Sequence, residues 1–111
     1  MTPTEIVLRQ AEEPKRATDS SGRILTLRRL NALEKLRLLK AAGPVLADNQ
    51  AWMAVALLAA SVTAIQDVPI PMPVSEGQIE ALVARLGDHG LDAVAESLNE
   101  DHRSAGGLEG N

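Results

Sequence analysis

The longest apolar segment of the chain runs from Ala51 to Ile65, and only Ser61 and Thr63 interrupt it. A helix that is apolar on every face must be covered on every face, and a chain of 111 residues has little other material to cover it. The segment therefore predicts either the central helix of a small bundle or a helix that a partner protein covers in part.

An amphipathic helix is predicted before this segment, at about residues 32–42. Asn31 stands three residues before Glu34, which is the spacing of a capping box at the start of a helix. Apolar residues then line one side of the helix, namely Leu33, Leu36 and Leu39. Gly43-Pro44 ends the pattern, because glycine is common just after a helix and proline does not continue one.

Two further helices are predicted towards the C-terminus, as a helical hairpin of residues 76–86 and 89–100. Ser75 and Gln78 have the spacing of a second capping box. The first helix carries apolar residues at positions i, i+3, i+4 and i+7, namely Ile79, Leu82, Val83 and Leu86. After Gly87 the same spacing returns, in Leu91, Val94, Ala95 and Leu98.

A turn cluster at residues 18–22 separates two short segments, residues 15–18 and 23–28, and predicts an antiparallel hairpin. This hairpin is the only strand pair that the pattern indicates. In residues 68–74, the proline segment, every second residue is proline, which removes backbone donors and favours an extended form. The proline segment is expected either to be a stiff connector packed on the core or to display its apolar residues to a partner.

Together these elements predict a mainly α fold with a small N-terminal β-hairpin, in the α+β class, in which a compact bundle of about four helices surrounds the central apolar helix. Trp52 is the only aromatic residue, so the core must be built from aliphatic side chains, which suits packed helices. One domain is expected over residues 15–101, with a loosely ordered arm at residues 1–14 and a disordered tail at residues 102–111.

Candidate catalytic and metal-binding groups are scarce. The absence of cysteine excludes disulfides and thiolate sites. Neither His89 nor His102 has metal-ligand spacing or an orienting carboxylate, and the chain has no glycine-rich phosphate loop, so we expect no catalysis, metal or cofactor. The N-terminus lacks a secretory pattern, and 15 apolar residues are fewer than the roughly 20 that span a bilayer. These observations predict a cytoplasmic protein.

Charge is unevenly distributed along the chain. Residues 1–40 carry nine Lys/Arg and five Asp/Glu, whereas residues 41–111 carry two and ten. Such asymmetry can guide docking on a charged partner or self-assembly. The bases considered for electrostatic contact are Arg23, Arg28, Arg29, Lys35, Arg37 and Lys40.

Two alternatives follow from this charge pattern. One is a small nucleic-acid-binding regulator that uses segment 15–40, and the other is a self-assembling structural subunit. The net charge of −4 and the lack of aromatic residues among the bases argue against nucleic acid.

The chain resembles the tail assembly chaperones of long-tailed bacteriophages and prophages over roughly residues 22–98. Four stretches carry the likeness: GRILTLRR at 22–29, ALLAASVTAI at 56–65, VPIP at 68–71 and EALVARLG at 80–87. The resemblance implies a cytoplasmic protein, absent from the finished virion, that coats the tape measure protein, helps recruit tail tube subunits and catalyses nothing. Members of this family are often made in two lengths by a translational frameshift.

The family has no fixed set of binding residues, so the candidates for client binding come from the physical properties of the side chains. Methionine adapts to irregular surfaces, and tryptophan is a common anchor at interfaces. On this basis the candidate client-binding residues are Trp52, Met53, Val68, Ile70 and Met72. Burial of Trp52 and Met53 in the core of the domain is the alternative.

Overall fold

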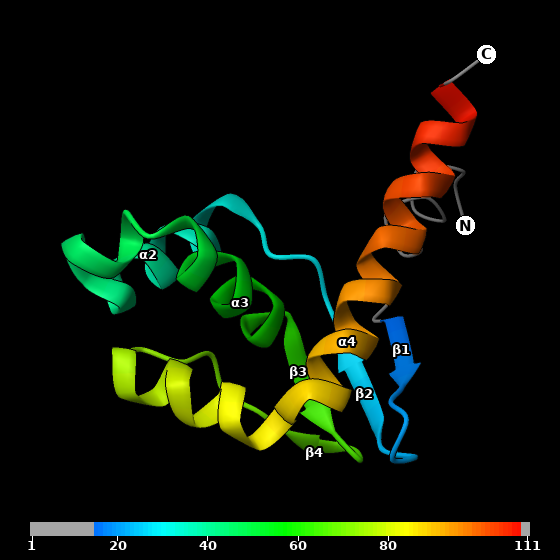
Figure 1. Cartoon of the computed structure of the whole chain (residues 1–111), viewed down its shortest axis with the longest axis horizontal. Coiled ribbons are helices and arrows are strands. Elements are labelled where there is room, and N and C mark those ends of the chain that lie inside the picture. The colour runs from blue at the N-terminus through cyan, green and yellow to red at the C-terminus, as the bar shows by residue number, and fades with distance from the viewer. Residues whose placement is uncertain (1–14, 110–111) are drawn as a thin grey trace, which may run out of the picture.

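The structure, a computed structural model, describes residues 15–109, and the side chains of residues 15–100. This part of the chain is a mixed α+β fold with three helices and one four-stranded antiparallel sheet (Figure 1). The strands are β1 (Lys15–Thr18), β2 (Ile24–Leu27), β3 (Val62–Ile65) and β4 (Val68–Pro69), and they lie in the sheet in this order. The helices are α2 (Ala32–Ala47), α3 (Gln50–Ala60) and α4 (Glu76–Glu109).

The two predicted ends of the chain are described in part or not at all. The arm at residues 1–14 lies outside the described residues. Of the tail at residues 102–111, the structure describes only the backbone up to Glu109, which belongs to α4.

The predicted N-terminal hairpin is confirmed. Strands β1 and β2 pair from Lys15 opposite Leu27 to Thr18 opposite Ile24. Gly22 lies in the turn with φ of 92°, a left-handed conformation that glycine adopts without a steric cost. Residues 18–22 therefore form the turn that their sequence predicted, between β1 and β2.

The prediction of one helix from Ala51 to Ile65 is wrong after Ala60. Ser61 ends α3, and its Oγ donates a hydrogen bond of 2.8 Å to the carbonyl oxygen of Leu57. The next four residues form β3, which pairs with β2, with Ile65 opposite Leu25. The β-branched side chains of this strand fit a pleated sheet better than a helix, and pairing with β2 satisfies its backbone.

A second hairpin, β3 to β4, was not predicted from the sequence. Gln66 and Asp67 connect its strands with φ of 52° and 65°, the positive values that a tight two-residue hairpin turn requires. Pro69 lies in the last strand of the sheet, where its missing N–H leaves no partner unsatisfied. The extended form expected for the proline segment is thus confirmed at Val68–Pro69, which form β4, and the first hairpin is not the only strand pair.

The predicted bundle of about four helices is wrong, because the described residues hold three helices and a sheet. Residues 76–86 and 89–100 belong to one helical element, α4, which Gly87 interrupts with φ of 64° and ψ of −174°. In Figure 1 the two segments of α4 meet at an angle and do not fold back on each other. Gly43 interrupts α2 in the same way, with φ of 85°, and Pro44 opens a further turn that ends at Ala47.

The core consists of two clusters that meet at α3. One cluster joins the sheet to both segments of α4 and includes Leu25, Leu27, Val62, Ile65, Leu86 and Val94. The other joins α2, α3 and the first segment of α4 and includes Leu38, Met53, Ala56 and Ile79. Because α3 contributes Ala59 to the first and Ala60 to the second, it is the central apolar helix that the sequence predicted.

Within the described part of the chain, none of the helices combines the length and the apolar character that a bilayer span requires.

Candidate functional site

The residues predicted to bind a client do not form one surface. Met53 is buried, and Trp52 is half-buried against the same cluster, so both pack in the domain as the alternative stated. Val68 is 54% exposed on the edge strand. Ile70 and Met72 are half-buried, and they pack on different core clusters.

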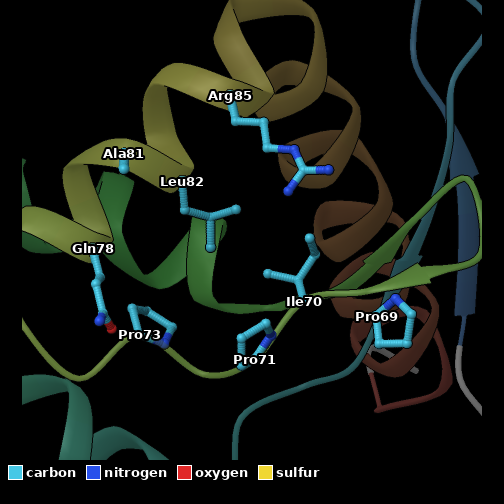
Figure 2. A pocket seen from close by; sticks show the side chains of 8 residues that line it. All are labelled: Pro69, Ile70, Pro71, Pro73, Gln78, Ala81, Leu82 and Arg85. Atoms are coloured by element: carbon cyan, nitrogen blue, oxygen red, sulfur yellow. The ribbon is translucent and has the colours of Figure 1, made fainter.

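A hollow of about 260 Å³ lies between the proline segment and the first segment of α4 (Figure 2). Its lining residues are Pro69, Ile70, Pro71, Pro73, Gln78, Ala81, Leu82 and Arg85. In Figure 2 the side chains of Leu82 and Arg85 extend from α4 towards Ile70. The backbone N–H of Val74 donates to Gln78 Oε1 at 2.9 Å, which fixes the end of the proline segment to the helix. This arrangement offers a small apolar hollow with one cation beside it.

A second hollow, of about 280 Å³, lies between α3 and α4 and contains the exposed side of Trp52. Its walls come from Val55 and Ala56 of α3 and from Ile79, Glu80 and Val83 of α4. The two hollows share no lining residue, although Ile79 and Leu82 are three residues apart on the same side of α4. Trp52 and Ile70 therefore belong to separate hollows.

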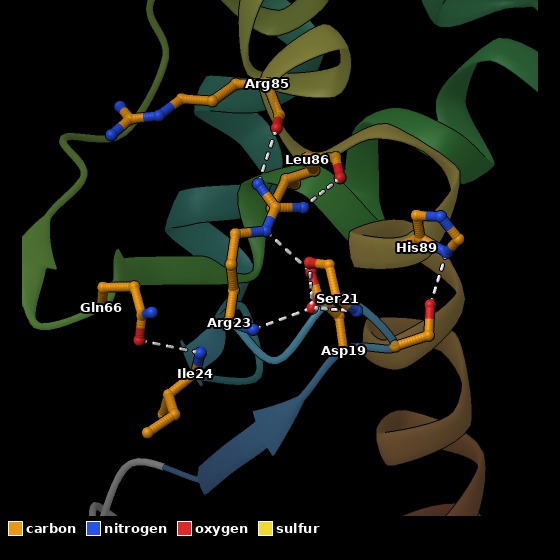
Figure 3. A network of polar contacts seen from close by, with 9 residues as sticks. Asp19, Ser21, Arg23, Ile24, Gln66, Arg85, Leu86 and His89 are labelled. Atoms are coloured by element: carbon orange, nitrogen blue, oxygen red, sulfur yellow. Dashed lines mark hydrogen bonds and ion pairs between the residues drawn. The ribbon is translucent and has the colours of Figure 1, made fainter.

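Two of the six predicted electrostatic contact residues are already used inside the protein. Arg23 donates through Nε to Asp19 at 2.8 Å, and through its terminal nitrogens to the carbonyl oxygens of Arg85 and Leu86 (Figure 3). Arg28 forms an ion pair with Glu34. The other four bases, Arg29, Lys35, Arg37 and Lys40, are exposed, and none makes a side-chain hydrogen bond or ion pair with a described residue.

The acid that holds Arg23 is itself buried. The carboxylate of Asp19 accepts hydrogen bonds from the hydroxyl and backbone N–H of Ser21 and from the backbone N–H of Arg23. These bonds, first that of the Ser21 hydroxyl, lower the pKa of Asp19 far below its ordinary value although burial opposes them. Asp19 and Arg23 are therefore a structural pair that links the first hairpin to the bend of α4.

Helix α2 has an exposed apolar face that the sequence analysis did not assign to a function. The predicted stripe of Leu33, Leu36 and Leu39 points away from the core, with exposed fractions of 53%, 64% and 41%. Leu38 and Ala42 are the residues of α2 that are buried. The i, i+4 spacing of Leu38 and Ala42 was a signal for the buried side, but the leucine stripe was the stronger pattern.

Ser20 and His89 form a polar contact that the sequence also did not predict. The Ser20 hydroxyl and His89 Nδ1 are hydrogen-bonded beside a hollow of about 430 Å³, which Asp92 and Glu96 also line. No described residue bonds to His89 Nε2, and a general base needs such an orienting partner. Among the described residues, no three His, Asp or Glu side chains are grouped to hold a metal ion.

Comparison with protein-family models, with curated proteins and with solved structures found no match to this chain.

Proposed function

We propose that this protein is a non-catalytic tail assembly chaperone of a long-tailed phage or prophage. It binds the tape measure protein in the host cytoplasm and helps recruit tail tube subunits. The likeness of residues 22–98 to this family is one support. The observation that carries the proposal is the exposed apolar face of α2, formed by Leu33, Leu36 and Leu39.

An exposed apolar face suits a chaperone of helical clients. A single exposed leucine is ordinary, but leucines that recur every three residues along one helix make a continuous apolar stripe. A tape measure protein in solution is a long helix with apolar faces that aggregate, and an apolar stripe can cover such a face. Arg37 and Lys40 are exposed and, four residues after Leu33 and Leu36, lie beside the stripe.

The test is co-expression with the tape measure protein of the same gene cluster. We expect the tape measure protein to remain in the soluble fraction and to co-purify with the chain. Serine at positions 33 and 36 removes the stripe without touching the core, and L33S/L36S is expected to lose the co-purification. Val74→Ser, at an exposed position outside α2, is the matched control and is expected to retain it. A tape measure protein that is equally insoluble with and without this chain would refute the proposal.

A nucleic-acid-binding regulator is the second candidate, and it is favoured by the four bases of residues 29–40 that have no ion-pair partner among the described residues. Phosphate contacts are strongest at low salt, so a shift assay with DNA and RNA at about 50 mM salt decides it. Binding that weakens steeply with salt supports this candidate, and no binding at low salt removes it.

A further inference from the structure

A hollow of about 190 Å³ lies where the start of α2 meets α3 and α4. Leu57 and Leu58 of α3 and Leu98 of α4 line it, and Arg29 and Lys35 lie on its sides. We call it the leucine groove. It differs from the other apolar hollows because two cations lie beside its apolar surface.

These two cations have no acidic partner among the described residues. The nearest acid in sequence is Glu34, and both of its carboxylate oxygens are engaged, one by Arg28 and the other by the backbone N–H of Asn31. Arg29 and Lys35 are exposed, and their side chains make no hydrogen bond or ion pair with a described residue. The groove therefore combines an apolar lining with positive charge that no described acidic side chain compensates.

The apolar surface continues beyond the groove along α2. Leu39 lies one turn after Lys35 on the same side of the helix, and Leu36 and Leu33 follow around its outer face. An occupant that covers both the groove and this stripe must itself be apolar along several turns. It must also present acidic groups at one edge to meet Arg29 and Lys35.

We propose that the leucine groove binds an acidic amphipathic helix of a partner protein. The apolar side of that helix covers the leucines, and its carboxylates pair with Arg29 and Lys35 and so fix its direction. This inference rests on the proposed function, because it takes the acidic helix to be the segment of the client that the chaperone binds.

The probe is a synthetic peptide of about 18 residues, long enough for five turns, with leucine at helical spacing and glutamate beside it. A second peptide carries lysine in place of every glutamate. Binding of fluorescently labelled peptides to the full chain is measured by anisotropy. We expect the glutamate peptide to bind at least tenfold more tightly than the lysine peptide, and R29E/K35E to reverse this order.

The matched control is R16E/R85E, which makes the same change of charge at two exposed arginines outside the groove lining and outside the leucine stripe. This control is expected to weaken binding of the glutamate peptide by less than threefold. If both double variants weaken it equally, general electrostatic attraction explains the binding and the inference is overturned. Equal binding of the two peptides overturns it as well.

Amide NMR of the full chain locates the bound peptide. Shifts at Leu57, Leu58 and Leu98 support the groove, whereas shifts confined to the surroundings of Trp52 or Ile70 overturn it. A short oligonucleotide that displaces the glutamate peptide through Arg29 and Lys35, or a dimer that R29E/K35E dissociates in sedimentation, assigns the groove to another occupant and also overturns the inference.

The inference and the proposed function can fail separately. If R29E/K35E still keeps the tape measure protein soluble, the groove is not the client site, and the chaperone function stands. If the wild-type chain binds the glutamate peptide in the groove but has no effect on the tape measure protein, the groove inference stands and the proposed function fails.

Discussion

At the scale of single residues, the pair of Asp19 and Arg23 connects two parts of the chain that are far apart in sequence. Arg23 donates to the carbonyl oxygens of Arg85 and Leu86, which have lost their helical partners because α4 is interrupted at Gly87. Asp19 orients the guanidinium, and its side chain is fully buried. The Asp19 carboxylate therefore helps to hold the first hairpin against the bend of α4, through Arg23.

Asp19→Asn is expected to lower the free energy of unfolding by about 1–3 kcal/mol at pH 7, because an amide cannot accept all the hydrogen bonds that the carboxylate accepts. The pKa of Asp19 in the folded protein lies well below its ordinary value. The carboxylate therefore contributes fully to the free energy of unfolding above about pH 4, and this contribution is lost as the pH falls towards the folded pKa. The difference between wild type and variant should shrink below pH 4. Urea unfolding across pH measures it.

Asp88→Asn provides the control, since Asp88 is exposed and makes no hydrogen bond or ion pair with a described residue. It should change stability by less than about 0.5 kcal/mol at neutral pH. If Asp19→Asn is equally harmless, Asp19 does not stabilise the fold.

At the scale of elements, glycines interrupt two helices and direct their later segments. Gly87 has φ of 64° and ψ of −174°, a conformation that residues with a side chain rarely adopt. The interruption lets the second segment of α4 turn away from the first and reach the sheet, where Ala93 and Val94 enter the core. Gly90 follows one turn of chain later, and a Cβ there would lie 3.0 Å from the Leu86 Cβ and 3.2 Å from Arg23 Nη2.

Gly87→Ala is expected to destabilise the protein by about 1–3 kcal/mol, because alanine is strained at this backbone conformation even though space for its methyl group exists. Thermal unfolding followed by circular dichroism measures the loss. Gly77→Ala is the matched control in the first segment of α4, where nothing lies within 4 Å and φ is not positive. It is expected to be neutral or slightly stabilising. Equal melting temperatures for the two variants would mean that the bend at Gly87 is not required.

At the scale of the whole molecule, two core clusters share α3 and should unfold together. The cluster that joins the sheet to α4, here called the sheet cluster, contains Leu25. The cluster that joins α2, α3 and the first segment of α4, here called the helical cluster, contains Leu38, and both leucine side chains are fully buried. The neighbouring alanines Ala59 and Ala60 of α3 enter different clusters. Loss of either cluster therefore removes the support of the other.

Leu25→Ala and Leu38→Ala are each expected to lower the free energy of unfolding by about 2–5 kcal/mol, because each leaves a cavity in the core. Trp52, the only aromatic residue, reports on the helical cluster by fluorescence, while circular dichroism reports on the whole chain. We expect the two signals to coincide for both variants. Leu36→Ala, at a position that is 64% exposed, is the control and should change stability by less than about 0.5 kcal/mol. Separate transitions would show that the clusters unfold independently.

The sequence by itself determined the features that depend on neighbours a few residues apart. The capping box of Asn31 and Glu34 formed with both of its hydrogen bonds, the turn at residues 18–22 closed the first hairpin, and Gly43 and Gly87 interrupted their helices. Each of these rests on local backbone preference or on hydrogen bonds within one turn. That is why they could be predicted from the pattern alone.

Tertiary structure decided which faces are buried and which segments pair. Val62–Ile65 became a strand because β2, some 40 residues earlier in the chain, supplies its hydrogen-bonding partner. The leucine stripe of α2 faces outward because Leu38 and Ala42 contact α3 and α4, and Met53 is buried for the same reason. Periodicity shows that a helix has an apolar side, but contacts between distant segments determine which side they cover. The candidate docking surface of this protein lies on the side that those contacts left open.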